Sequence, residues 1–248
     1  MRLVLPILGT GSVAIAAASL YYAVFAVRSQ WLGPTYWRGR RDRNAVALTF
    51  DDGPSPDTER ILDVLAAHKA SATFFMVGRE VESFPGIAQR VVAEGHDVGN
   101  HSYSHTSYLF QRAAETQNQI RRAQSVIAET IGVRPLIARP PYGVRTLAYF
   151  RATRALDLQT VQWEVAGFDW KRITPRQIAD NVLRKTRPGS IILLHDGDSE
   201  KKVSRKNTVE ALPLIIEGLR DRDLQIAPLS QLLPAKTDNL TKGKRIHD

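Results

Sequence analysis

The chain contains no cysteine, so disulfide bonds and thiolate metal sites are excluded. This absence does not fix the cellular compartment. The sequence also shows no internal repeat. Its 248 residues, of which 43% are hydrophobic and 24% are charged, are enough for one well-buried domain with a short appendage.

Charged side chains are missing from residues 3–27. An apolar stretch of this length can span a bilayer, for which about 20 residues suffice. The alternative is a cleaved signal peptide, but only Met1 and Arg2 precede the stretch, and no clean small-x-small cleavage site precedes Arg28. We therefore expect a transmembrane anchor or uncleaved signal over residues 1–28, rather than a cleaved leader or a buried core helix.

The formal net charge is +9, and two short segments contribute much of it: a basic linker over residues 29–44 and a polar tail over residues 235–248. Nucleic-acid binding needs a clustered basic face with interleaved aromatic residues or a known motif. The sequence shows neither, so no nucleic-acid partner is expected. Attraction of the linker to anionic lipid or an anionic envelope polymer and simple solvation of its arginines both stay open. The tail is expected to be disordered.

Between residues 45 and 234, short apolar runs alternate with longer amphipathic ones. We expect strands at 46–50, 72–76, 97–99, 136–138, 159–163, 190–194 and 224–227. Helices are expected at 58–68, 80–94, 111–131, 145–156, 175–186 and 208–220. This alternation predicts an α/β fold with a mainly parallel sheet, and the length suits a small barrel.

Polar clusters follow five of the expected strands. In parallel α/β folds and barrels, active sites gather at the carboxyl ends of strands. The clusters are Asp51-Asp52, residues 100–105, residues 139–143, Asp169-Trp170 and residues 195–197. Because all of them follow the carboxyl end of a strand, we expect them to converge on one site.

Two adjacent carboxylates, Asp51 and Asp52, end the first expected strand and are followed by glycine and proline. Neighbouring carboxylates repel, so their usual uses are a cation, a shared proton or separate tasks. A turn built from two solvated aspartates is the ordinary alternative.

His101 and His105 stand four positions apart. On a helical turn this spacing places both imidazoles on one face, close enough to bind one metal ion. The pair alone is a weak signal, and the glutamate of the zinc-protease motif is missing between them. With one carboxylate, however, it makes a two-His, one-Asp site with open positions, suited to a divalent ion such as zinc. The second carboxylate could then take a proton from a metal-bound water, and His195 could protonate the leaving group.

Five motifs in this order resemble the polysaccharide deacetylases of carbohydrate esterase family 4, the NodB-homology group. They are Thr49-Phe-Asp-Asp-Gly53, His101-Ser-x-x-His105, Arg139-x-Pro-Tyr142, Asp169-Trp170 and Leu193-x-His195, and they lie within residues 45–234. The resemblance implies a distorted (β/α)7 barrel as the catalytic domain, preceded here by the expected transmembrane helix. It also implies metal-dependent hydrolysis of N-acetyl, or sometimes O-acetyl, groups of a polysaccharide.

The resemblance also implies a role for each site residue. Asp51 corresponds to the catalytic base and Arg139 to the arginine that holds it, whereas His195 corresponds to the general acid. The implied metal ligands are Asp52, His101 and His105, and the implied metal is one divalent ion, in first place Zn²⁺. The residues expected at the oxyanion and the acetyl group are Tyr142, through its backbone N–H, Trp170 and Leu193.

One position departs from the family pattern, because Ala166 stands where an acid often supports the site three positions before the Asp-Trp pair. Glu164, Asp169 or Asp196 could replace that acid. Loss of such a supporting group can cost about 10- to 100-fold in metal affinity or activity. The departure motivates an alternative function, a catalytically weakened glycan-binding homologue, and a different metallohydrolase such as a peptidase is disfavoured.

The implied substrate is an N-acetylated envelope glycan such as peptidoglycan, with chitin-type oligosaccharides and acetylated xylan as alternatives. Such a substrate predicts a single-pass membrane protein whose catalytic domain is extracytoplasmic. The arginines that follow the anchor conflict with this prediction, because the positive-inside tendency favours a cytoplasmic position for them. The sequence gives no indication of the oligomeric state.

Overall fold

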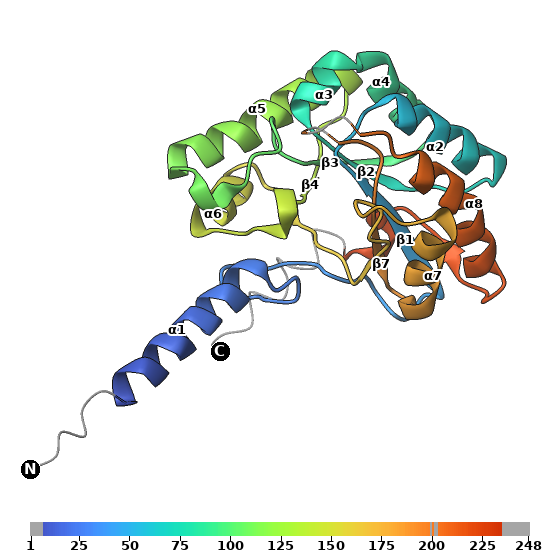
Figure 1. The fold of residues 1–248 in the computed structure, drawn as a ribbon. Helices are drawn as coiled ribbons and strands as arrows, with labels where there is room; N and C mark the ends of the chain where they lie inside the picture. Colours follow the sequence, from blue (N-terminus) through green and yellow to red (C-terminus); the bar gives the residue numbers. More distant parts are fainter. Residues whose placement is uncertain (1–6, 199, 201–202, 235–248) are drawn as a thin grey trace, which may run out of the picture.

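The computed structural model describes residues 7–198, 200 and 203–234 of the chain (Figure 1). At its centre lies one sheet in which every described strand pairing is parallel. The strands are β1 (Ala45–Asp51), β2 (Thr73–Met76), β3 (Asp97–Asn100), β4 (Ile137–Ala138), β5 (Gln159–Thr160), β6 (Val165–Ala166), β7 (Ile191–His195) and β8 (Gln225–Ile226). The predicted α/β class and parallel sheet are confirmed.

The strand order is β5-β4-β3-β2-β1-β7-β6, and β8 pairs with the first residues of β1. Among the described residues, no strand pairing joins the two ends of this order, β5 and β6. The strands therefore form a half-barrel, consistent with the NodB-like fold, rather than a closed ring of ladders. All seven predicted strands coincide with observed ones, whereas β6 was not predicted.

Helices cover the outside of the sheet (Figure 1). They are α2 (Pro56–Ala67), α3 (Gly78–Ser83), α4 (Pro85–Ala93), α5 (Ala113–Ile131), α6 (Leu147–Ala155), α7 (Pro175–Lys185), α8 (Lys206–Arg220) and α9 (Leu229–Leu232). Two 3₁₀ turns, η1 (Tyr108–Phe110) and η2 (Pro141–Gly143), join strands to helices. The main core lies between the sheet and helices α2, α4, α7 and α8, and β1 is buried along its whole length.

Local chemistry explains where these helices begin and end. Thr174 caps α7, with Pro175 in the first turn and Gln177 completing a capping box. Gly132 ends α5 in the left-handed conformation, with φ of 70°. The prediction of a single helix over residues 80–94 is wrong, because two helices, α3 and α4, cover this range. The first ends before Pro85, whose nitrogen cannot donate a hydrogen bond to a preceding turn.

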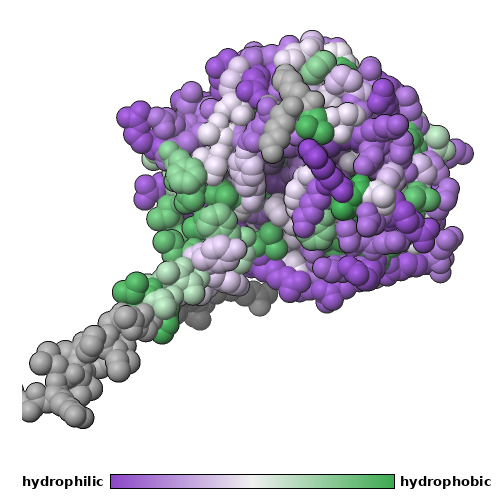
Figure 2. Space-filling model, viewed as in Figure 1, coloured by the Kyte–Doolittle hydropathy of each residue, from purple (hydrophilic) through white to green (hydrophobic). Residues whose placement is uncertain are grey.

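The apolar N-terminal stretch forms helix α1 (Ile7–Phe25), which points away from the sheet (Figure 1). Its described surface is largely hydrophobic (Figure 2). In the part of the chain that the structure describes, no helix has both the length and the hydropathy to cross a bilayer. The prediction of a transmembrane helix, for which about 20 apolar residues are needed, is therefore not supported.

The last turn of α1 is held by a buried arginine that lies just before α6. Ala23 and Val24 are buried, and the Arg145 N–H donates to the Val24 carbonyl at 3.3 Å. The Arg145 guanidinium donates to the carbonyls of Val24, Ala26 and Ser29, at 3.4, 2.5 and 3.0 Å. This cation at the negative end of a helix dipole joins α1 to the domain.

The segment expected as a basic linker, residues 29–44, lies along the sheet. Tyr36 forms two backbone hydrogen bonds at the end of β5. It donates to Thr160 O at 2.9 Å and accepts from Gln162 N at 2.7 Å. Two residues on, Arg38 forms a bridge with Ser190 beside β7. The segment thus bridges the end of β5 and the start of β7. The predicted tail over residues 235–248 lies outside the described residues.

Candidate active site

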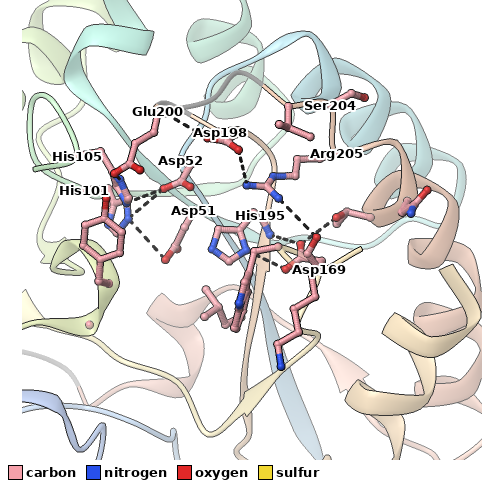
Figure 3. Close-up of a pocket in the computed structure, with 18 of the residues that line it drawn as sticks. Asp51, Asp52, His101, His105, Asp169, His195, Asp198, Glu200, Ser204 and Arg205 are labelled. Carbon is pink, nitrogen blue, oxygen red and sulfur yellow. Dashed lines mark hydrogen bonds and ion pairs between the residues drawn. The ribbon is translucent and has the colours of Figure 1, made fainter. Parts of the chain in front are cut away.

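A cavity of about 670 Å³ opens at the carboxyl ends of the strands (Figure 3). Its lining includes most of the residues singled out in the sequence, brought together from β1, β7 and the loops after β3, β4 and β6. They are Asp51, Asp52, His101, His105, Tyr142, Trp170, Leu193 and His195. The predicted convergence on one site is confirmed. Arg139 lies just beneath, fully buried.

Asp52, His101 and His105 form a candidate metal site (Figure 3). All three are buried, and Asp52 Oδ1 lies 3.0 Å from His105 Nε2 and 3.4 Å from His101 Nε2. That oxygen has no hydrogen-bond partner among the described residues. Tetrahedral zinc holds oxygen and nitrogen ligands at about 2.0–2.2 Å, which separates them by about 3.3–3.6 Å. The 3.4 Å separation lies in this range and the 3.0 Å separation lies just below it, so the donor types and their spacing suit a divalent ion.

The two histidines do not lie on a helical turn, as the sequence predicted, but in the loop after β3. Ser102 and His105 have positive φ of 67° and 59°. Hydrogen bonds stabilise this unusual loop: Ser102 N donates to Asn100 Oδ1 at 3.0 Å, and His105 N donates to Ser102 Oγ at 2.9 Å. His101 Nδ1 lies 2.7 Å from the Arg139 carbonyl oxygen, so this nitrogen donates and Nε2 faces Asp52.

Charges in the site favour an ionised Asp52. Burial alone would raise its pKa, but its contacts with His101 and His105 hold the pKa well below the usual range. Burial would likewise lower the pKa of His105, yet its close contact with the Asp52 carboxylate raises it. A carboxylate that stays ionised between two imidazoles is a suitable ligand for a cation.

Asp51 faces the same cavity but has its own cationic partner. Arg139 donates to Asp51 Oδ1 at 2.7 Å and to Thr49 Oγ1 at 2.8 Å through one nitrogen, and to the Gln162 carbonyl at 3.0 Å through the other. The other oxygen of Asp51 lies 3.8 Å from His101 Nε2. The carboxylate is thus fixed beside the candidate metal site while one oxygen stays directed to it.

His195 is held from the opposite side of the cavity by Asp169 (Figure 3). Its Nδ1 lies 2.8 Å from Asp169 Oδ1, and its backbone N–H donates to Asp169 Oδ2 at 2.7 Å. Thr208 Oγ1 also donates to Oδ2, at 2.8 Å. Although burial would lower it, the pKa of His195 is raised to about 9, chiefly by the charge of Asp169. His195 therefore carries a proton at neutral pH.

The three acids that could replace the one missing at position 166 have different contacts in the structure. Asp169 contacts His195, whereas Glu164 pairs with Arg187 and Ser190 at the other end of the sheet. The third, Asp196, accepts from Gly53 N at 3.0 Å and Thr58 Oγ1 at 2.7 Å, which ties the loop after β1 to the end of β7.

None of these acids reaches Arg139. Its Nε is buried without a hydrogen-bond partner, and Ala166 lies buried in β6. The departure at Ala166 therefore leaves Arg139 with Asp51 as its one carboxylate partner among the described residues.

The remaining predicted residues form the walls of the cavity. The Tyr142 ring lies 4.8 Å from His105, and the Trp170 ring lies 5.3 Å from His195, at 79° to it. Leu193 is buried and also lines the cavity. These apolar groups flank the polar centre, as a pocket for an acyl group requires.

Sequence reasoning missed several residues that support the site. Thr49 and Gln162 hold Arg139, and Thr208 holds Asp169.

Arg205, also missed, lines the cavity, and its Nε donates to the Gly197 carbonyl at 2.7 Å. Thr49 stood inside a motif and could have been found there; the others are ordinary residues whose role depends on contacts far apart in the chain.

Comparisons with known proteins agree with this geometry. The sequence model of the polysaccharide deacetylase family matches residues 38–161. A peptidoglycan-N-acetylglucosamine deacetylase of Bacillus cereus is 36% identical over 195 residues, covering 78% of this chain and 70% of the relative. A chitooligosaccharide deacetylase of Bradyrhizobium sp. is 39% identical over 197 residues, covering 76% and 90%.

Among solved structures, a peptidoglycan N-acetylglucosamine deacetylase in complex with a naphthyl-N-oxidanyl-benzamide superposes with a TM-score of 0.75 at 34% identity, covering 80% of this chain and 92% of that one. The half-barrel and its site thus define a carbohydrate deacetylase. The chain belongs to the polysaccharide deacetylase family, with the NodB-homology domain of carbohydrate esterase family 4. It is a hydrolase that acts on carbon–nitrogen bonds other than peptide bonds.

Proposed function

We propose that the chain is a metal-dependent deacetylase that removes N-acetyl groups from a cell-envelope glycan such as peptidoglycan. The observation that carries the proposal is the pairing of Asp51–Arg139 and Asp169–His195 on either side of the Asp52 site in one cavity. Relatives named for peptidoglycan and for chitooligosaccharides support an N-acetylated glucosamine polymer, with chitin-type oligosaccharides as the alternative substrate. The proposal includes O-acetyl groups, because the same chemistry hydrolyses them.

Asp52, His101 and His105 would hold the metal ion, and zinc suits their oxygen and nitrogen atoms. When bound, such an ion supplies a Lewis acid that lowers the pKa of water and polarises the acetyl carbonyl. Asp51, fixed by Arg139, takes the proton from the attacking water. The Tyr142 N–H donates to the oxygen on which negative charge develops.

His195 completes the reaction as general acid. It gives its proton to the leaving amine nitrogen, so that the carbon–nitrogen bond breaks to release acetate and the free amine. Asp169 keeps the imidazole protonated and oriented for that transfer. Trp170 and Leu193 enclose the acetyl methyl group.

A catalytically weakened glycan-binding homologue is the second candidate, and the unpaired Nε of Arg139 favours it. The missing partner affects only Arg139, which supports the proposed base Asp51. Both acid–base pairs are in place, and a protein that merely binds glycan has no use for them.

The deciding experiment measures acetate released from defined N-acetylated peptidoglycan fragments and chitooligosaccharides, with added zinc and with chelator. We expect release by the zinc-loaded wild type, loss with chelator, and at least a 10³-fold lower rate for Asp51→Asn, which keeps all three metal ligands. Glycan binding with no acetate release from any substrate, and no difference between wild type and Asp51→Asn, would instead establish the binding homologue.

The position of the catalytic domain outside the cytoplasm stays a prediction, motivated by the envelope substrate proposed here. Protease accessibility of the domain in intact cells, compared with lysed cells, tests it. Protection in intact cells that disappears on lysis would contradict it.

A further inference from the structure

We infer that Gln162 is a positioning residue that holds the oxyanion-binding turn and the arginine of the catalytic base in one fixed relation. The inference rests on the proposed deacetylase function and adds a residue that belongs to none of the five motifs. Gln162 follows β5 and its side chain is completely buried.

Three hydrogen bonds place Gln162 between the turn that carries Tyr142 and the Arg139–Asp51 pair. Its side-chain Nε2 donates to the Gly143 carbonyl at 2.8 Å, and its backbone carbonyl accepts from Arg139 at 3.0 Å. Its backbone N–H donates to the Tyr36 carbonyl at 2.7 Å, so the N-terminal segment fixes it in turn. One residue therefore contacts both the turn that carries Tyr142 and the cation that orients Asp51.

The turn needs such support because its backbone is unusual. Tyr142 and Gly143 both have positive φ, of 57° and 69°. A non-glycine residue in this region is strained and persists only where its surroundings hold it. A Cβ on Gly143 would lie 2.8 Å from Trp163 and 3.2 Å from Gln162 Oε1, so the turn is pressed against these two side chains. Their positions decide where the Tyr142 N–H points.

The chemistry of the side chain supports a positioning role over simple packing. Gln162 Oε1 is buried without a hydrogen-bond partner among the described residues. A buried unpaired polar atom costs about 1–3 kcal/mol. A methionine would fill similar space without that cost, so the useful part of this amide is the donor that holds Gly143.

The test compares Gln162→Met with Gln159→Met, a matched control. Gln159 is the same residue type three positions earlier, and it borders a different cavity, at the far side near Pro34. Each zinc-loaded variant is assayed on the glycan that wild type cleaves fastest and on its N-trifluoroacetyl counterpart. The trifluoroacetyl carbonyl is more electrophilic and depends less on a well-placed oxyanion donor.

For Gln162→Met we expect kcat on the acetyl substrate to fall about 10- to 100-fold, since a displacement of about 1 Å can cost that much. KM and zinc affinity should change less than about threefold, and the loss on the trifluoroacetyl substrate should be clearly smaller. Gln159→Met should stay within about twofold of wild type. Rates refer to the concentration of folded, zinc-binding protein. A second variant, Gln162→Glu, keeps the size but sets an acceptor against the Gly143 carbonyl, and should show the same pattern.

An equal loss of kcat on both substrates, or a Gln162→Met variant as active as the Gln159→Met control, would overturn the inference while leaving the deacetylase function intact. If the wild-type protein releases neither acetate nor trifluoroacetate, the proposed function itself fails. The two failures are therefore distinguishable.

Discussion

His195 and Asp169 show how one buried contact sets the protonation of a side chain in the cavity. Because the neighbouring carboxylate raises the pKa of His195 to about 9, the proposed general acid stays charged until the solution becomes alkaline. For Asp169→Asn we expect the alkaline limb of kcat to move from near pH 9 towards the ordinary histidine value of 6.5, with kcat about 10²- to 10³-fold lower at pH 8. A pH–rate profile measures both; an unmoved limb would assign the ionisation to another group.

The same pair makes stability depend on pH. A histidine whose folded-state pKa lies above its unfolded value binds the proton more tightly when folded. Its contribution is complete below about pH 6.5 and is lost as the pH rises through about 9. Urea unfolding of wild type should therefore show a decline in stability over that window which Asp169→Asn lacks.

His96 behaves in the opposite direction. It is buried against Phe74, with Nδ1 accepting from Ala72 N at 3.2 Å, and burial lowers its pKa. The unfolded chain then takes up the proton first, so stability should fall as the pH drops below about 6.5.

The variant His96→Asn keeps an acceptor for Ala72 but cannot titrate. We expect it to cost about 1 kcal/mol at pH 7 through lost packing. The stability difference between pH 7 and pH 5 should shrink relative to wild type. Denaturant unfolding at the two pH values measures this, and an unchanged difference would exclude His96 as its source.

At the residue scale, sequence reasoning located the groups that carry chemistry, because their types and their position after strands both point to a site. It placed Asp51, Asp52, His101, His105 and His195 in one cavity, where the structure has them. It could not find Gln162 or Thr208, because an amide or hydroxyl acquires its role only from partners that the fold brings near.

At the scale of an element, the loop between β3 and α5 shapes the candidate metal site. Ser102 Oγ accepts from His105 N and stabilises the left-handed conformation of His105. We expect Ser102→Ala to weaken zinc binding about 10-fold, because the ligand loses its support. The matched control is Ser104→Ala in the same loop, where the hydroxyl contacts Thr106 and Gln119 instead. Competition with a chromogenic chelator gives both affinities, and equal values would refute the role of Ser102.

Strands were predicted well because their apolar runs are short and bounded, whereas two local features were misjudged. The i, i+4 spacing of His101 and His105 suggested a helical turn, yet side chains four apart also meet across a loop that reverses direction with positive φ. The break at Pro85 carried its own signal, since proline at the first turn of a helix starts it rather than continues it.

The N-terminal segment and the domain stabilise each other at the scale of the whole molecule. Removing residues 1–44 would leave the buried Arg145 guanidinium without the three carbonyls it binds. Because an unpaired buried charge is costly, we expect a loss of about 3–5 kcal/mol in the free energy of unfolding. Removing residues 1–22 keeps those carbonyls and should cost much less.

Arg145→Leu supplies the control for this prediction. In the chain lacking residues 1–44, it removes the stranded charge and should recover part of the lost stability, whereas in the full chain it should destabilise. Thermal unfolding of the four proteins gives the coupling between the segment and the arginine. Additive effects would mean that Arg145 plays no part in holding the segment.

The arginine that grips the last turn of α1 stands three positions after Tyr142 in the chain. Helix and reaction centre therefore share one short mechanical linkage. A displacement of α1 would reach the turn that carries Tyr142 through the backbone N–H and the guanidinium of Arg145.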